Sequence, residues 1–142
     1  MAQTDYNYGT GLRNVGSYQV SGHPYLTGST NMGAAGTELK ISFPFVTKSI
    51  TIISSGTFGS SPTENQFKVH FNAAADGDVL TGGHFITLDS DEDSMTFDIK
   101  CKEIYLTTVT AAAGYQLYAS LTNIPTRSMY DLTGSGLTDA LG

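Results

Sequence analysis

"GYQLYASLTN", residues 114–123, is the stretch that decides the fold of this chain. Its larger apolar side chains recur at every second position, which is the period of a β-strand whose two faces meet different surroundings. One face carries Tyr115, Leu117, Ala119 and Leu121, and the other carries Gln116, Tyr118, Ser120 and Thr122. The pattern predicts a strand that packs its first face into a core.

Further segments of the same character precede this one. They are residues 37–43, 46–53, 66–72, 83–88, 94–100 and 103–108, with a less regular alternation in 46–53 and 83–88. Polar turns such as "SSGTFGSSPTEN" separate them, and no stretch of comparable length has the helical period. These features predict an all-β fold, an antiparallel β-sandwich or jelly-roll-like domain over residues 37–124. Residues 16–20 are a candidate eighth strand, and "LTDALG" at residues 137–142 is the only candidate helix.

The charge pattern excludes several classes of partner. Charged residues make up 14% of the 142 residues, against about 25% in ordinary soluble domains. The net charge is -6 and the 7 Lys and Arg residues are scattered, which argues against nucleic-acid binding. We find no apolar run that could span a membrane and no secretory signal. The single cysteine, Cys101, excludes an internal disulfide framework, so we expect assembly in a reducing cytoplasm.

The two flanks differ from this centre. Residues 1–36 hold seven glycines and only two charged side chains, and residues 125–142 also lack alternation. Pro125 marks the point where the last strand has to stop. We interpret residues 1–36 as an extended N-terminal arm and residues 125–142 as a C-terminal tail, both of which become ordered on a partner chain; flexible termini are the alternative. The side chains expected to contact that partner are Tyr6, Tyr8, Leu12, Tyr18, Tyr25, Met129 and Tyr130. Deleting residues 1–30 is then expected to leave a folded domain.

The most suggestive chemistry lies in "LDSDEDSMTFDIK", where Asp89, Asp91 and Asp93 alternate as in a calcium-binding loop. Ser94 stands where an EF-hand requires glycine, and Lys100 stands where it requires the bidentate glutamate. An EF-hand is therefore excluded. A looser calcium site remains open, and a solvated acidic turn between two strands is the favoured interpretation.

No catalytic constellation is evident, and we expect a protein that is not an enzyme and needs no cofactor. His23, His70 and His84 have no metal-binding spacing, and His70 falls on the polar face of its strand. Cys101 lies at a turn between lysines and is either a small space-filling residue or an exposed thiol. Outward tyrosines such as Tyr25 and Tyr118 suit a protein interface, or the sugar-stacking face of a carbohydrate-binding module.

The phrases "GSYQVSGHPYLTGS", "ISFPFVTKSITIISSG", "LDSDEDSMTFDIKCKEIYL" and "LTNIPTRSMYDLTGSGLT" together resemble small virion proteins of tailed phages, especially those of marine and cyanobacterial hosts. The resemblance runs through most of the chain and rests on no ligand motif. It implies a β-rich capsid decoration or cement protein, a homotrimer that bridges major capsid subunits on the virion surface and is made in the host cytoplasm. A tail, adaptor or fibre subunit and a carbohydrate-binding β-sandwich are the alternatives.

Overall fold

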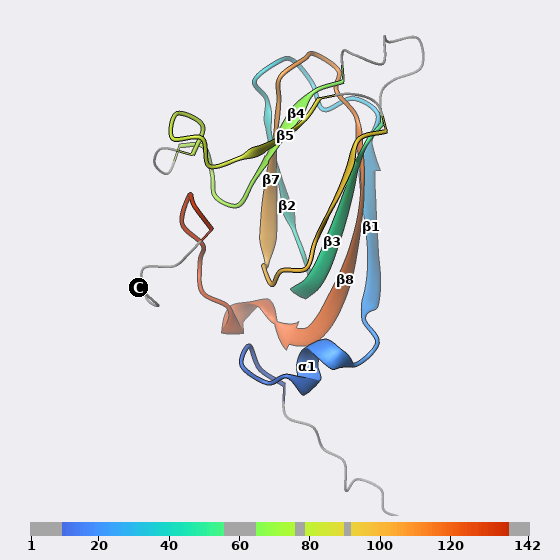
Figure 1. Ribbon diagram of the computed structural model, residues 1–142, viewed down its shortest axis with the longest axis vertical. Coiled ribbons are helices and arrows are strands. Elements are labelled where there is room, and N and C mark those ends of the chain that lie inside the picture. The colour runs from blue at the N-terminus through green and yellow to red at the C-terminus, as the bar shows by residue number, and fades with distance from the viewer. Residues whose placement is uncertain (1–9, 56–64, 76–78, 90–91, 137–142) are drawn as a thin grey trace, which may run out of the picture.

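A computed structural model describes residues 10–55, 65–75, 79–89 and 92–136 of the chain (Figure 1). Within these ranges the chain forms two four-stranded antiparallel sheets that pack face to face, with almost no helix. The strands are β1 (His23–Ser29), β2 (Glu38–Ser42), β3 (Phe45–Ser54), β4 (Phe67–His70), β5 (Ile86–Leu88), β6 (Ser94–Phe97), β7 (Glu103–Thr108) and β8 (Tyr115–Pro125). Helix α1 (Gly16–Gln19) precedes β1, and a 3-10 helix, η2 (Thr126–Ser128), follows β8. The all-β sandwich predicted from the alternation is confirmed.

The strand order is that of a jelly roll. We call the sheet with order β1-β8-β3-β6 sheet A and the sheet with order β2-β7-β4-β5 sheet B. The first strand pairs with the eighth, the second with the seventh, the third with the sixth and the fourth with the fifth. This is one long antiparallel hairpin of four strand pairs, and it is wound so that alternate pairs fall in opposite sheets.

The core lies between the two sheets and comes from the predicted apolar faces. Ile50 and Ile52 of β3 and Leu117 of β8 face it from sheet A, and Ile104 and Leu106 of β7 face it from sheet B; all are at most 2% exposed. Each of the seven segments predicted as strands overlaps with one of β2 to β8, and β3 and β8 extend one or two residues beyond their predicted ends. β8 ends at Pro125, as its missing N–H requires.

The weak alternation of residues 46–53 has a structural cause. The pairing of β3 with β8 shifts register on both sides of Thr47. Val46 and Thr47 are consecutive and both fully buried. The Thr47 hydroxyl donates to the backbone oxygen of Ile99 at 3.0 Å and accepts from the backbone N–H of Cys101 at 3.1 Å. The irregular start of β3 therefore anchors the connection from β6 to β7.

The expected boundary of the N-terminal arm is wrong for the described residues. Residues 23–29 form β1, which pairs along its whole length with β8 and is an integral strand of sheet A. The candidate strand at residues 16–20 is instead the short helix α1. Asn14 forms the turn that leads into it, since its side-chain oxygen accepts the backbone N–H of Gly16 at 3.0 Å and its backbone oxygen accepts the N–H of Ser17 at 3.0 Å. The candidate helix at residues 137–142 lies outside the described residues.

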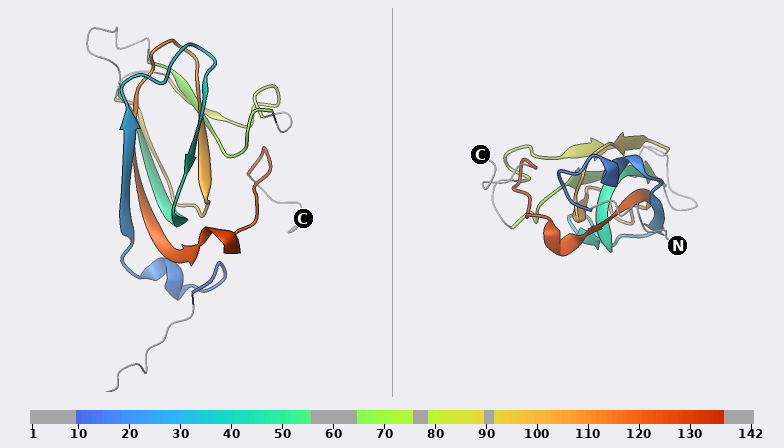
Figure 2. Two further views of the ribbon diagram at one scale, coloured as in Figure 1. Left: turned by 180° about the vertical axis from the view of Figure 1, so that it is seen from behind. Right: turned by 90° about the horizontal axis from the view of Figure 1, so that it is seen from below.

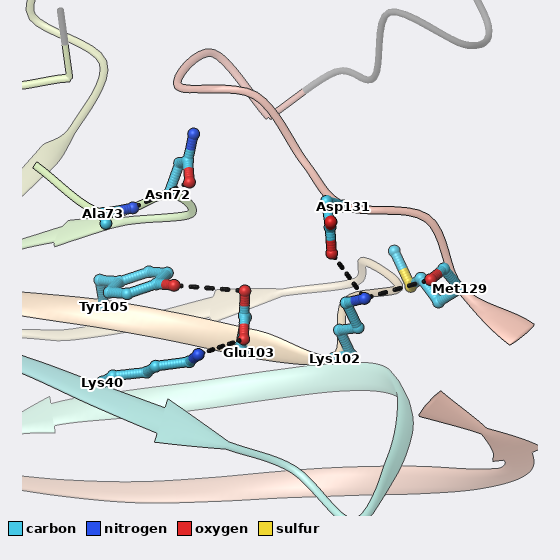
Figure 3. Close-up of polar contacts among 8 residues, drawn as sticks. All are labelled: Lys40, Asn72, Ala73, Lys102, Glu103, Tyr105, Met129 and Asp131. Atoms are coloured by element: carbon cyan, nitrogen blue, oxygen red, sulfur yellow. Dashed lines mark hydrogen bonds and ion pairs between the residues drawn. The ribbon is translucent and has the colours of Figure 1, made fainter. Parts of the chain in front are cut away.

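The described part of the C-terminal tail also packs on the sandwich. Met129 is 4% exposed and belongs to the core, and Tyr130 and Leu132 pack against it. The Lys102 ammonium, which lies just before β7, forms an ion pair with Asp131 at 2.6 Å and donates to the backbone oxygen of Met129 at 3.2 Å (Figure 3). Residues 125–136 are thus held by their own chain.

Candidate interaction surfaces

The outer face of sheet A carries no side chain that is charged at neutral pH across two rows of strand-paired residues. In the first row Leu26 of β1 lies beside Tyr118 of β8, which lies beside Thr51 of β3, which lies beside Thr96 of β6. The second row contains Gly28, Gln116, Ile53 and Ser94. The hydroxyls of Thr51 and Thr96 are 3.0 Å apart. We call these eight residues the sheet A patch.

Three large hydrophobic side chains of the sheet A patch are exposed to solvent. Leu26 is 76% exposed, Tyr118 is 43% exposed and Ile53 is 37% exposed. The neighbouring side chains are hydroxyls, an amide and a glycine, which form neither ion pairs nor a charged rim. A face of this kind has the composition of the centre of a protein interface, where charged residues are depleted and tyrosine is enriched.

Sheet B is different on its outer side, where charged groups interact. Lys40 of β2 forms an ion pair with Glu103 of β7 at 3.1 Å, and the Tyr105 hydroxyl donates to the same carboxylate at 3.2 Å (Figure 3). These contacts raise the pKa of Lys40, chiefly through its hydrogen bond to Glu103. Lys68 of β4 lies over the ring of Phe85, 4.4 Å from its centroid. The outer faces of the two sheets therefore differ in charge, and only that of sheet B carries interacting charged groups in the rows compared.

The side chains predicted to contact a partner serve the fold where the structure describes them. Leu12, Tyr18, Tyr25 and Tyr130 pack against the core cluster, and Met129 is part of it. The Tyr18 hydroxyl donates to the backbone oxygen of Leu12 at 2.8 Å. Tyr25 points inward, whereas the prediction that Tyr118 points outward is correct. Tyr6 and Tyr8 lie outside the described residues, so their contact with a partner remains a prediction.

Sequence reasoning missed Leu26 as a surface residue. It lies in "HPYLTGS", in a stretch interpreted as an arm, and its neighbours Tyr25 and Thr27 face the core side. The available signal was the absence of any charge near it. A solvated sheet face ordinarily carries lysine or glutamate, and residues 14–37 contain none.

A groove of about 910 Å³ is the second candidate site. It lies where the C-terminal tail passes the ends of β3 and β6, and four aromatic rings line it: Tyr18, Phe71, Phe97 and Tyr130. Phe71 and Phe97 are in edge-to-face contact, with centroids 5.9 Å apart. Lys48 and Lys100 supply the cationic groups of the lining. Several aromatic rings with a few polar groups beside them suit a ligand with a flat apolar face.

The described residues offer no metal centre. No three His, Cys, Asp or Glu side chains among them are placed to hold a metal ion. In the acidic turn, Asp93 accepts the backbone N–H of Asp89 at 3.1 Å, while Asp91 lies outside the described ranges. A calcium site at this turn therefore remains an open alternative.

Of the titratable residues considered for catalysis, His70 and Cys101 are buried in the fold, whereas His23 and His84 are exposed. His70 alternates with core-facing Val69 as predicted, but it is fully buried, and its ring nitrogens are hydrogen-bonded to the Asn72 backbone oxygen at 2.8 Å and the Thr107 hydroxyl at 2.7 Å. Cys101 is buried too, and this desolvation raises the pKa of its thiol to about 11. Of the two interpretations of Cys101, the space-filling one is correct.

No protein-family model matches this chain, and no curated protein matches it. Within the described ranges, the helices are too short and too polar to cross a lipid bilayer.

Proposed function

We propose that this chain is a non-enzymatic structural protein of a tailed-phage-type virion, which decorates and cements the capsid by bridging major capsid subunits. The sheet A patch is the contact surface in this proposal, and its exposed, uncharged character is the observation that carries it. The protein is assembled in the host cytoplasm and resides on the capsid surface.

The physical case rests on what a cement protein has to do. Such a protein binds through many copies on a symmetric lattice. The affinity of each single contact can therefore be modest, provided that the two surfaces are complementary and do not repel each other. An uncharged patch bearing Leu26 and Tyr118 buries apolar area without stripping water from ions. The jelly roll itself is common among viral capsid and lectin domains, which supports the proposal by analogy of fold alone.

Binding to particles of the encoding virus tests this proposal. Purified particles stripped of the protein are mixed with the wild type, with Leu26→Glu and with Tyr118→Lys, and bound protein is measured after sedimentation. Both patch variants should lose at least tenfold in affinity, because each puts a charge into a desolvated contact. Lys68→Glu, on the outer side of sheet B, is the matched control and should bind like the wild type. If both patch variants bind the particles as well as the wild type does, the sheet A patch is not the surface that contacts the capsid.

The copy number on purified particles separates the capsid role from a tail, adaptor or fibre role. A cement protein occupies positions repeated over the whole shell, whereas a tail or adaptor component is confined to one vertex. Quantifying the protein against the major capsid protein on a stained gel distinguishes the two. The homotrimer implied by the phage resemblance is tested by the same material, through the mass of the released protein.

The aromatic groove favours a second candidate, a carbohydrate-binding module. The rings of Phe71, Phe97 and Tyr130 in a groove of about 910 Å³ could stack on sugar faces. A glycan array probed with the wild type and with Tyr130→Ala tests this, with and without chelator to include the acidic turn. Glycan binding that Tyr130→Ala abolishes would favour this candidate over the capsid role.

A further inference from the structure

The four edge strands of the two sheets are protected very unequally. β5 has three residues and β6 has four, so both are short. β2 has five residues and carries Glu38 and Lys40. β1 has seven residues and no charged side chain. Short edges and charged edges resist pairing with another chain, whereas a long uncharged edge invites it. Among the described strands, β1 is therefore the least protected edge.

The direction of the backbone groups of β1 follows from hydrogen bonds elsewhere in sheet A. The N–H of Ser55 donates to the backbone oxygen of Gly114, just before β8, at 3.1 Å, while the N–H of Ser54 donates to the backbone oxygen of Asp93, just before β6, at 2.7 Å. The two sides of an antiparallel strand alternate residue by residue. In the regular part of β3, the backbone groups of odd-numbered residues thus form hydrogen bonds with β8, and those of even-numbered residues form hydrogen bonds with β6.

The same alternation determines the direction of the backbone groups in β8 and then in β1. Thr51 of β3 is paired with Tyr118, so the even-numbered residues of β8 bond to β3 and the odd-numbered ones bond to β1. Ala119 is paired with Tyr25 and Leu117 is paired with Thr27. The odd-numbered residues of β1 therefore bond to β8, and the even-numbered ones direct their backbone groups to the free edge.

The free edge of β1 presents Pro24, Leu26 and Gly28. All three are exposed, in contrast to their half-buried neighbours Tyr25 and Thr27. Proline has no N–H, and in sheets it is tolerated where that position faces away from the ladder, which agrees with the assignment. Figures 1 and 2 show β1 at the rim of sheet A with no other element beyond it.

We propose that β1 pairs in antiparallel fashion with the β1 of a second copy of this chain, about a two-fold axis at Leu26. Leu26 is the middle residue of the seven-residue strand. In this register each Leu26 exchanges both backbone hydrogen bonds with Leu26 of the second copy. Pro24 lies opposite Gly28 of the second copy, and the Gly28 N–H donates to the Pro24 carbonyl oxygen. The missing N–H of Pro24 leaves only the Gly28 oxygen of that pair without a strand donor.

The chemistry of the edge favours a copy of itself as the occupant. A two-fold interface brings each patch against the same patch, so a charged strand would face its own charge. β1 avoids this conflict because it contains no Asp, Glu, Lys or Arg side chain. The pairing also joins two sheet A patches across the axis, with the two Leu26 side chains adjacent. This inference does not rest on the capsid proposal, and it predicts a dimer where the phage resemblance implies a trimer.

Light scattering coupled to size-exclusion chromatography, over a dilution series, measures the mass of the full chain. The wild type should have twice the chain mass of 15.1 kDa. Leu26→Lys, which places like charges at the axis, and Leu26→Pro, which removes a donor that the single chain leaves unused, should both give monomers. Ile86→Lys, on the edge strand β5, is the matched control and should stay dimeric. A monomeric or trimeric wild type, or a dimer that survives Leu26→Lys, would overturn the proposal.

Amide hydrogen exchange provides a readout specific to the strand pairing. In the wild type, the amides of Leu26 and Gly28 should be protected, although the alternation of hydrogen bonds directs both away from β8. In Leu26→Lys the Gly28 amide should exchange at least tenfold faster, while the amides of Tyr25 and Thr27 remain protected by β8. Equal exchange of Gly28 in the two proteins would show that β1 does not pair with a second copy.

Discussion

The ring of Tyr25 packs edge-on against the ring of Phe43, with 5.5 Å between the centroids and 82° between the ring planes. Tyr25 lies in β1, at the rim of sheet A, and Phe43 lies in the turn that joins β2 of sheet B to β3. The contact closes the sandwich on this side. It also shows that an aromatic residue of the glycine-rich N-terminal region is part of the folded domain.

Replacing Tyr25 by alanine should therefore destabilise the protein. The loss of a half-buried aromatic ring and its edge-to-face contact costs about 2 kcal/mol in the free energy of unfolding. Tyr25→Phe keeps the ring and should stay within about 0.5 kcal/mol of the wild type. Urea denaturation measures both, and an alanine variant as stable as the phenylalanine variant would show that the contact contributes nothing.

Deleting residues 1–30 should abolish cooperative folding, which reverses the expectation from sequence. The deletion removes α1 and β1 together, leaves residues 115–121 of β8 without their neighbouring strand and exposes the core beside Phe43. A thermal transition followed by near-ultraviolet circular dichroism should be absent. A sharp transition in the truncated chain would restore the interpretation of this region as a dispensable arm.

A second stabilising contact, at the other end of β3, involves buried Asn65. Its side-chain nitrogen donates to the Ser54 hydroxyl and, at 3.1 Å, to the Gly114 oxygen, while its side-chain oxygen accepts the Gly114 N–H at 2.7 Å. Asn65→Ala should cost about 3 kcal/mol, because it leaves buried backbone groups unpaired. Asn123→Ala is the matched control: Asn123 is exposed and its side-chain oxygen is hydrogen-bonded to the His23 ring at 2.8 Å, so its loss should cost less than about 1 kcal/mol. Equal costs in chemical denaturation would contradict the assigned role of Asn65.

How much of this fold was predictable differs between its strands. β8 and β7 have one face in the core, so their apolar residues recur with period two, and the prediction from sequence was correct. In β1 the relation is reversed, since Leu26 lies on the outer face while Thr27 faces inward. Periodicity could not identify a strand whose outer face is as apolar as its inner one. Leu26, the most exposed large hydrophobic residue of the sheet A patch, is thus also the residue whose outward position prevented the prediction of β1 as a strand.

Other errors have a similar physical origin. His70 alternates correctly with Val69, yet both are buried, because the outer side of β4 is covered: the His70 ring stacks on that of Tyr105, 5.8 Å away. The contacts of Asn65 with Gly114 join residues that are 49 positions apart, so the sequence pattern around either residue does not predict them. Alternation predicts which residues lie in strands. Whether other residues bury the outer face of a strand depends on tertiary packing.

The attachment of the C-terminal tail should depend on Lys102. Its ammonium group bonds to both Asp131 and the Met129 backbone oxygen, and the ion pair lowers the pKa of the Asp131 carboxyl. Lys102→Met should speed amide exchange in residues 129–136, and 1 M salt or a pH below the pKa of Asp131 should have the same effect on the wild type. Lys40→Met, which breaks the ion pair with Glu103 (Figure 3), is the control and should leave the tail unchanged. Tail exchange that Lys102→Met does not alter would show that packing of Met129 alone holds it.

The buried thiol of Cys101 should make the protein less stable at high pH. Burial raises the pKa of Cys101 from its ordinary value of 9.0 to about 11, so the unfolded chain releases this proton first. Stability is therefore unaffected below the unfolded pKa and falls between the two values, by up to about 1.4 kcal/mol per pH unit. Tyrosines and lysines titrate in the same range, so the quantity to measure is the difference in unfolding free energy between the wild type and Cys101→Ala. That difference should shrink as the pH rises from about 9 to about 11. A difference independent of pH would mean that the thiolate forms as easily in the folded protein as in the unfolded chain, contrary to a sulfur atom enclosed beside Thr47.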